Sequence, residues 1–319
     1  VGVRTLLLHN SNQLDILSST KDNDVFYDRP LKVEIWYPAL LNMDEQEKEV
    51  YDEVMGNYND PKRPLISFQF KGRAKRDAKI KHSETPYPLV ITSHGYTGSR
   101  LMFSYLTEQL ASQGYIVVSI DHTDSTFRDA GPFVSTLLNR SLDDLFVLDA
   151  MDKLSKDSEA FLFNLLDANN TAIIGYSMGG YGALNVAGAG YSPQAVQLFK
   201  GFTRGRLDLE QRMIGNPSFE ATFDSRIKAI VAIAPWGMEN GVWDEQGLLG
   251  LKIPTFFVAG SMDDISGYDD GIKAIYNGAL ISMRGIILRP THLQPMPSKR
   301  DCISMNTCVT QILFGIKDV

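Results

Sequence analysis

The chain has 319 residues, of which 44% are hydrophobic, and this is enough for one large α/β domain with insertions. The formal net charge of −7, without a basic cluster interleaved with aromatic residues, argues against a nucleic-acid-binding protein. No apolar segment reaches the ~18 residues that a transmembrane helix needs. Because the chain begins at Val1, a targeting peptide can already be missing, and the sequence leaves the compartment open.

The N-terminal part of the chain predicts antiparallel strands. Residues 3–8 and 31–37 are expected to form the leading strands, and residues 42–60 an acidic, polar connection. From residue 88 onward, short apolar runs alternate with helical stretches, which is typical of a mostly parallel sheet with helices on both faces. We therefore expect a single α/β domain over residues 1–319, and the sequence indicates no oligomeric state.

The first motif in chain order follows a short buried strand, Leu89 to Ser93. The strand leads into His94-Gly95-Tyr96, which resembles the His-Gly oxyanion loop of α/β-hydrolases. In such a loop, the backbone N–H of Tyr96 and the N–H of Met178 would bind the negative charge that develops on a substrate oxygen. The alternative is that the glycines shape an ordinary loop, with His94 as a hydrogen-bonded turn residue.

The second motif is Gly175-Tyr176-Ser177-Met178-Gly179, which comes directly after the apolar run 172–174. A serine between two such glycines suits a sharp strand-to-helix turn, because side chains at the glycine positions would collide where strand and helix pack closely. Small residues then predict a slim helix. The pattern makes Ser177 a candidate nucleophile; the alternative is a chance match in a glycine-rich turn.

After this helix, residues 190–226 form an insertion before the next strand, 227–233. Helical pieces are expected near residues 193–198 and 207–213. The insertion is either a cap over the site or a surface excursion. Trp236 and Trp243 follow the strand at its C-terminal end, where ligands bind in open α/β sheets. They are candidate substrate-binding residues that line an acyl pocket, or else they pack in the core or the cap.

The candidate acid follows the predicted strand 254–259, where Gly260 lies three residues before Asp263. This spacing favours Asp263 over Asp264, which can instead cap a helix or bind the loop backbone. An acid at this place would orient the catalytic base and stabilise its protonated form.

The candidate base is His292, because it is the only one of the five histidines that follows Ser177 in the chain. The apolar run 285–288 would deliver it to the same edge of the sheet. The alternatives are that His292 is a surface loop residue, or that His122 is the base, although its place one strand after the oxyanion loop suggests an architectural hydrogen bond.

These motifs are similar to those of the serine α/β-hydrolases related to platelet-activating-factor acetylhydrolases, within the group of predicted dienelactone hydrolases. The resemblance extends from about residue 25 to residue 280. It is carried by the stretches 29–38, 72–78, 88–100, 121–126, 175–179, 234–237 and 260–268. Polyester hydrolases are similar only at the elbow around Ser177 and at the oxyanion loop. The histidine loop, 289–297, keeps only the histidine and the prolines of the family pattern.

The resemblance implies an α/β-hydrolase fold, Ser177, Asp263 and His292 as catalytic triad, and Tyr96 and Met178 as oxyanion donors. It implies hydrolysis of small-molecule carboxylic esters with short or oxidised acyl groups, including phospholipid-derived esters, through an acyl-enzyme. This mechanism needs no metal and no organic cofactor. Alternatives are a lactone, thioester or amide hydrolase of the same fold, and a catalytically impaired relative that acts as a binding protein.

The C-terminal tail, residues 298–319, contains both cysteines, Cys302 and Cys308. Two cysteines are too few for a disulfide framework, and no nearby histidines complete a zinc site. A single disulfide between them is optional. The tail is short for a segment that closes the sheet, and a truncated or altered terminus would explain it.

Overall fold

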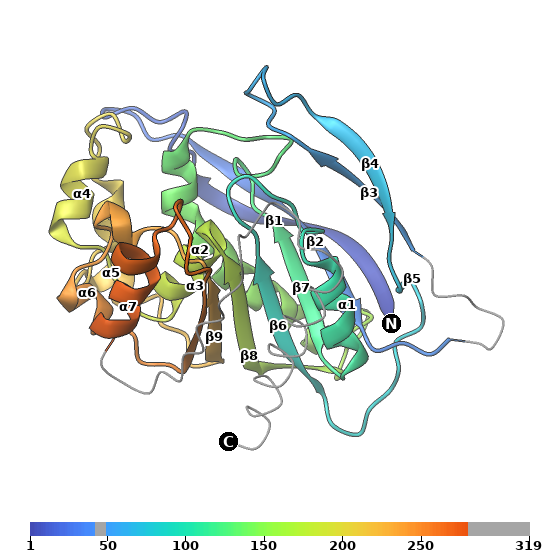
Figure 1. The fold of residues 1–319 in the computed structure, drawn as a ribbon. Coiled ribbons are helices and arrows are strands. Elements are labelled where there is room, and N and C mark those ends of the chain that lie inside the picture. Colours follow the sequence, from blue (N-terminus) through green and yellow to red (C-terminus); the bar gives the residue numbers. More distant parts are fainter. Residues whose placement is uncertain (42–48, 280–319) are drawn as a thin grey trace.

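The computed structural model describes residues 1–41 and 49–279. Its centre is an eight-stranded sheet with the strand order β10-β9-β8-β6-β7-β2-β1-β5 (Figure 1). The strands are β1 (Gly2–Leu14), β2 (Phe26–Tyr37), β5 (Lys75–Arg76), β6 (Tyr87–Ser93), β7 (Ile116–Asp121), β8 (Leu166–Tyr176), β9 (Ile227–Ile233) and β10 (Thr255–Val258). The helices are α1 (Ser104–Ser112), α2 (Phe133–Lys156), α3 (Met178–Val186), α4 (Pro193–Phe199), α5 (Pro217–Glu220), α6 (Glu245–Leu248) and α7 (Lys273–Gly278), with the short turns η1 (Asp208–Arg212), η2 (Met238–Asn240) and η3 (Tyr268–Ile272).

The strand pairing confirms the predicted fold class. β2 pairs antiparallel with both β1 and β7, whereas β6, β7, β8, β9 and β10 run parallel to one another. The carboxyl ends of these parallel strands therefore lie at one edge of the sheet, the upper edge in Figure 1. Residues that directly follow the strands come together there, and this edge carries the oxyanion loop and the Ser177 turn.

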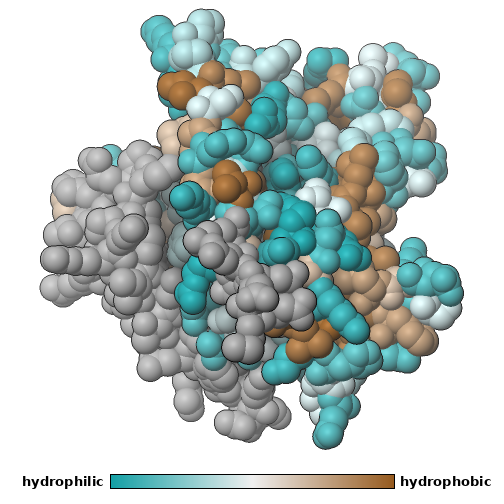
Figure 2. Space-filling view, turned by 90° about the vertical axis from the view of Figure 1, so that its right-hand side faces the viewer, coloured by the Kyte–Doolittle hydropathy of each residue, from teal (hydrophilic) through white to brown (hydrophobic). Residues whose placement is uncertain are grey.

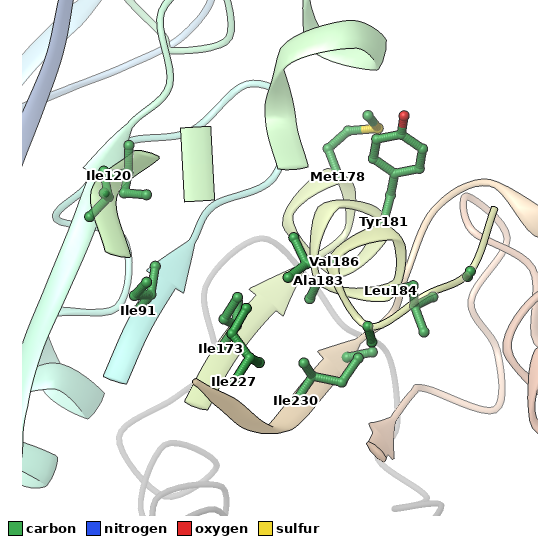
Figure 3. Packing of buried hydrophobic residues seen from close by; sticks show 14 of the residues in the cluster. Ile91, Ile120, Ile173, Met178, Tyr181, Ala183, Leu184, Val186, Ile227 and Ile230 are labelled. Carbon is green, nitrogen blue, oxygen red and sulfur yellow. The ribbon is translucent and has the colours of Figure 1, made fainter. Parts of the chain in front are cut away.

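Helices cover both faces of the sheet, and buried side chains alternate between two cores. On β6, Leu89 and Ile91 belong to the larger core beneath α2 and α3, whereas Val90 belongs to the smaller core beneath α1. Figure 3 shows part of the larger core, where Ile91 and Ile173 of neighbouring strands lie near helix α3. A strand that is buried on both faces reads as a continuous apolar run, which is why these strands were predictable.

One strand pair was not expected. β3 (Val50–Met55) and β4 (Ile66–Lys71) form a separate hairpin, so the prediction that residues 42–60 are a polar connection is wrong for β3. Tyr51 holds the hairpin to the sheet, because its hydroxyl accepts a hydrogen bond from Trp36 Nε1 (2.8 Å) on β2 and its ring lies beside that of Trp36 (centroids 6.4 Å apart). Figure 2, seen from the hairpin side, shows hydrophobic residues scattered among hydrophilic ones.

The insertion, residues 190–226, contains α4 and η1 where helical pieces were expected, followed by α5. The hydroxyl of Tyr191 forms a hydrogen bond with that of Tyr181 on α3. Arg206 forms an ion pair with Asp24 (2.8 Å) in the connection between β1 and β2. The insertion is therefore anchored to α3 at one end and to the β1–β2 connection further along.

Candidate active site

Ser177 occupies the turn between β8 and α3, as the sequence predicts. Its backbone has φ 52° and ψ −113°, in a region that residues with a Cβ rarely adopt. The turn is held by the Ser177 N–H, which donates to Ile233 O (2.9 Å), and by the Ser177 carbonyl, which accepts from Tyr181 N (3.0 Å) and Trp236 N (3.2 Å). The side chain is partly exposed. A strained and partly exposed serine at the carboxyl edge has the geometry of a nucleophile elbow.

The two glycines of the motif are required by close backbone contacts. A Cβ on Gly175 would lie 2.0 Å from Gly179 O, and a Cβ on Gly179 would lie 1.9 Å from Ser93 O. Both distances are far below van der Waals contact. The glycines thus allow α3 to pack tightly on its own strand and on the end of β6, which is the reason inferred from the sequence.

The predicted oxyanion loop lies against Ser177. An ideal Cβ on Gly95 would be 3.3 Å from Ser177 Cβ, so the loop backbone passes directly beside the serine. Tyr96 follows Gly95, and its hydroxyl donates to Gly131 O (2.9 Å). Met178 is the first residue of α3, so its N–H has no partner within the helix. The structure therefore brings the loop that contains Tyr96 close to Ser177, which Met178 directly follows, and the role of Tyr96 and Met178 as oxyanion donors stays a prediction.

Asp263 lies in the loop after β10, close to the Ser177 turn. Its Oδ1 accepts hydrogen bonds from the backbone N–H groups of Ile265 (3.0 Å) and Ser266 (2.9 Å). Burial and, to a lesser extent, the negative charge of Asp263 raise the pKa of Tyr176, the residue before the nucleophile. Asp264 is exposed. Thus Asp263 itself makes, through Oδ1, the loop-backbone hydrogen bonds that the sequence offered to Asp264, and its role as the acid stays a prediction.

A second carboxylate, Glu239 in η2, was not singled out from the sequence. Its Oε2 accepts from Gly237 N (3.1 Å) and its Oε1 from Asn240 Nδ2 (2.6 Å). Burial raises its pKa, and nearby Asp263 contributes in the same direction. Glu239 follows strand β9 by six residues, so its position after a parallel strand was the signal that would have found it.

The predicted base, His292, lies outside the described residues, and so do Cys302 and Cys308. Among the other four histidines, His9 and His82 are exposed and His94 and His122 are buried. Burial, followed by the positive charge of Arg140, lowers the pKa of His122 to about 3. Its ring bonds to Ser93 and Asp143, in agreement with the architectural role inferred from its position.

An aromatic wall stands beside Ser177, formed by Tyr96, Phe133 and Trp236. The Phe133 ring meets the Tyr96 ring edge to face (centroids 5.3 Å apart) and the Trp236 ring likewise (5.0 Å). All three side chains are partly exposed. Trp236 is therefore at the site. Phe133 was missed, although an aromatic residue at the start of the helix after β7 lies at the same carboxyl edge.

Trp243 is in a different environment. It is only 2% exposed, its Nε1 donates to Asn185 Oδ1 (3.1 Å), and its ring packs against Tyr181. Of the two uses that the sequence left open for this residue, the structure supports core packing. The ring of Trp243 lies in the hydrophobic core and does not reach the site directly. It contacts Tyr181, and the ring of Tyr181 contacts Trp236 at the site.

Within residues 1–41 and 49–279, no group of three or more His, Cys, Asp or Glu side chains could hold a metal ion. In the same part of the chain, no helix combines the length and the apolar character that crossing a bilayer requires.

Comparisons with known proteins agree with this geometry. Residues 65–133 match the family described as platelet-activating factor acetylhydrolase, isoform II, a region that contains the oxyanion loop and ends before Ser177. Cutinase est1 of Thermobifida alba is 26% identical over 60% of this chain and 47% of its own length. Cutinase 2 of Thermobifida cellulosilytica is 25% identical over 67% of this chain and 63% of its own. The chain thus spans about half to under two thirds of the length of these relatives.

Cutinases hydrolyse polyesters, and the sequence predicted similarity to polyester hydrolases only at the elbow and the oxyanion loop. The observed similarity to cutinases covers 60–67% of this chain and is therefore longer than expected. Among solved structures, a ferulic acid esterase from Streptomyces cinnamoneus superposes with a TM-score of 0.52 at 19% identity, covering 90% of this chain and 72% of that one. At this identity the likeness shows the fold, which is that of the α/β-hydrolases. The chain is therefore similar to platelet-activating factor acetylhydrolases over residues 65–133 and to cutinases over a longer stretch, and its fold is that of the α/β-hydrolases.

Proposed function

We propose that the chain is a carboxylic ester hydrolase that works through a covalent acyl-enzyme on Ser177. The observation that carries this proposal is the strained turn at Ser177, which packs through Gly179 against Ser93 and lies beside Gly95 of the oxyanion loop. A serine at such a turn is exposed to a substrate, and we expect the backbone N–H groups of Tyr96 and Met178 to bind the substrate oxygen. The names of the similar proteins, cutinases and a ferulic acid esterase, support the same class of reaction.

In the proposed mechanism, Ser177 Oγ attacks the ester carbonyl while His292 takes the hydroxyl proton. The N–H groups of Tyr96 and Met178 bind the oxyanion, and Asp263 orients the imidazole of His292. His292 then gives the proton to the leaving alcohol, and the acyl-enzyme forms. Water, activated by the same histidine, attacks the acyl-enzyme and releases the acid. Each step is performed by residues of the chain, and the substrate is a small-molecule ester. We also propose that the insertion, residues 190–226, acts as a cap that covers the site during these steps.

The experiment that tests the proposal is labelling with a fluorophosphonate, followed by intact-mass detection and peptide mapping. We expect a single adduct on Ser177, because only an activated serine reacts quickly with this reagent. Labelling of His292→Ala should be slowed by orders of magnitude. Ser112→Ala, a change at an exposed serine of α1, is the matched control and should label like the native chain. A folded native chain that does not label, or an adduct elsewhere, would contradict the proposal.

The aromatic wall predicts a preference for apolar acyl groups. Trp236→Ala is expected to lower kcat/KM for a butyryl ester roughly 10-fold relative to an acetyl ester, because apolar contacts in a pocket discriminate by about 1–3 kcal/mol. Trp243→Phe is the control: it removes the hydrogen bond to Asn185 in the core and should lower Tm without changing this ratio. If both variants changed the ratio of butyryl to acetyl kcat/KM equally, Trp236 would not be the residue that selects the acyl group. The butyryl thioester and amide, measured alongside, separate an esterase from the alternative hydrolases.

A further inference from the structure

Three hydrogen-bonded side chains lie beneath the oxyanion loop: Ser93, His122 and Asp143. Ser93 Oγ is 2.8 Å from His122 Nε2, and His122 Nδ1 is 3.0 Å from Asp143 Oδ2. The order of chemical groups is that of a catalytic triad, but all three residues are at most 1% exposed. A substrate cannot reach this serine. We call these three residues the buried relay.

The direction of the hydrogen bonds in the buried relay is determined by Arg29. Its Nε and Nη2 donate to the two oxygens of Asp143 at 2.8 and 3.0 Å. Burial alone would raise the pKa of Asp143, but the charge of Arg29 and the hydrogen bonds from His122 and Arg29 together outweigh burial and lower this pKa to about 2. An ionised carboxylate only accepts, so His122 carries its proton on Nδ1. His122 Nε2 then accepts from the hydroxyl of Ser93.

The buried relay is joined to the oxyanion loop by further hydrogen bonds. The N–H of His122 donates to His94 Nε2 (3.2 Å), and His94 Nδ1 in turn bonds to Gly95 O (2.6 Å). Arg140, on α2, donates from Nη1 to the carbonyl of His94 (2.7 Å). Thus residues 93 to 95 are each held in place by a hydrogen bond to a side chain or a carbonyl group. Tyr96, the predicted oxyanion donor, directly follows them.

Stability alone gives a poor reason for so many buried ionisable side chains at this place. Arg140 and Asp144 are also buried, and within the described residues both oxygens of Asp144 lack a hydrogen-bond partner. Apolar side chains of similar volume are often as stabilising as buried ionic groups, or more so. Directional bonds, in contrast, restrict a loop to one position. The oxyanion loop needs such a restriction, since its N–H must already be in place when negative charge develops.

We propose that Ser93, His122 and Asp143 are positioning residues for the reaction, which hold residues 93–95 so that the N–H of Tyr96 meets the oxyanion. This inference rests on the proposed esterase function. It assigns no contact with substrate to the buried relay. Its consequence is that weakening the buried relay slows the step in which the oxyanion forms and leaves the binding of the uncharged ester almost unchanged.

The test compares Ser93→Ala and Asp143→Asn with Tyr51→Phe in the full chain. Tyr51→Phe is the matched control, because it removes a buried hydroxyl from another three-membered chain, Trp36–Tyr51–Glu108, next to the other core. For each variant, Tm, kcat and KM for a butyryl ester are measured, together with Ki of a trifluoromethyl ketone. This inhibitor forms a bond between its carbonyl carbon and Ser177 Oγ, so its adduct carries an oxyanion.

We expect Ser93→Ala and Asp143→Asn to lower kcat by roughly 10- to 100-fold, less than the ~10²–10³ that follows loss of an entire oxyanion donor. KM should stay within about two-fold, and Ki should rise by about the factor lost in kcat, as expected for an interaction made only in the transition state. Tyr51→Phe should lower Tm and leave kcat and Ki unchanged. Asp143→Asn also weakens the bond to Arg29, so Ser93→Ala is the decisive variant if Asp143→Asn does not fold.

The inference would be overturned by a folded Ser93→Ala variant with native kcat and Ki, by a change in KM alone, or by an equal loss of kcat in Tyr51→Phe. These results differ from failure of the proposed function. In that case the native chain itself neither hydrolyses the ester nor binds the ketone, and the role proposed for the buried relay falls with it.

Discussion

Ser177→Ala is expected to lower kcat for an ester substrate by about 10⁶-fold, because a triad without its nucleophile keeps only the small acceleration due to binding and the oxyanion donors. The free energy of unfolding should be nearly unchanged. Alanine has a Cβ like serine, so the strain at φ 52° remains, and the hydrogen bonds of this turn are made by backbone atoms. Steady-state kinetics with a butyryl ester and thermal unfolding check both parts.

Ser177→Gly is the companion variant for this prediction. It also removes the nucleophile, but glycine adopts a positive φ without steric cost, so it should be about 1 kcal/mol more stable than Ser177→Ala. A Ser177→Ala variant that keeps more than about a thousandth of the native kcat would show that the ester is cleaved at another residue. Equal stability of the two variants would count against backbone strain at the turn.

Asp263→Asn is expected to lower kcat by about 10⁴-fold, because an amide cannot stabilise the protonated histidine and favours the wrong tautomer. The loop should keep its conformation. An asparagine Oδ1 can still accept from the N–H groups of Ile265 and Ser266, which are the bonds that Asp263 Oδ1 makes. Unfolding curves of this variant should therefore resemble those of the native chain while its turnover nearly disappears.

Asp264→Asn is the matched control for this prediction, since the same chemical change is made one residue along, at an exposed side chain. It should leave kcat within about two-fold. If Asp264→Asn caused the larger loss, the acid would be Asp264. If neither change affected turnover, Glu239 would be the next carboxylate to replace, because it is half-buried and near Asp263.

The parallel part of the fold was predictable because local patterns determine it. Strands buried on both faces are continuous apolar runs, and those around residues 90, 117, 173, 230 and 256 all form strands. The hairpin of β3 and β4 was missed for the opposite reason. In β3, the buried Tyr51 and Val54 flank the acidic Asp52 and Glu53, so the strand shows no continuous apolar run. The burial of Tyr51 depends on its contacts with Trp36 and Phe70, which come from other strands.

The environments of the two tryptophans could not be predicted from the sequence. Trp236 and Trp243 both follow β9, and nothing in their neighbours along the chain distinguishes them. In the structure, Trp236 meets Phe133 beside Ser177, whereas Trp243 bonds to Asn185 in the core. The difference depends on partners more than 50 residues away along the chain.

What the sequence by itself determined is the Ser177 turn, since glycines at both second neighbours are a local requirement of backbone packing, visible in five consecutive residues. The positions of the parallel strands along the chain also follow from local apolar runs. Only the tertiary structure decided which residues surround this turn. His122 meets Ser93 29 positions earlier, and Asp143 meets Arg29 114 positions earlier. Such bonds exist because sheet packing brings separate strands and helices to one edge, and no spacing along the chain encodes that approach.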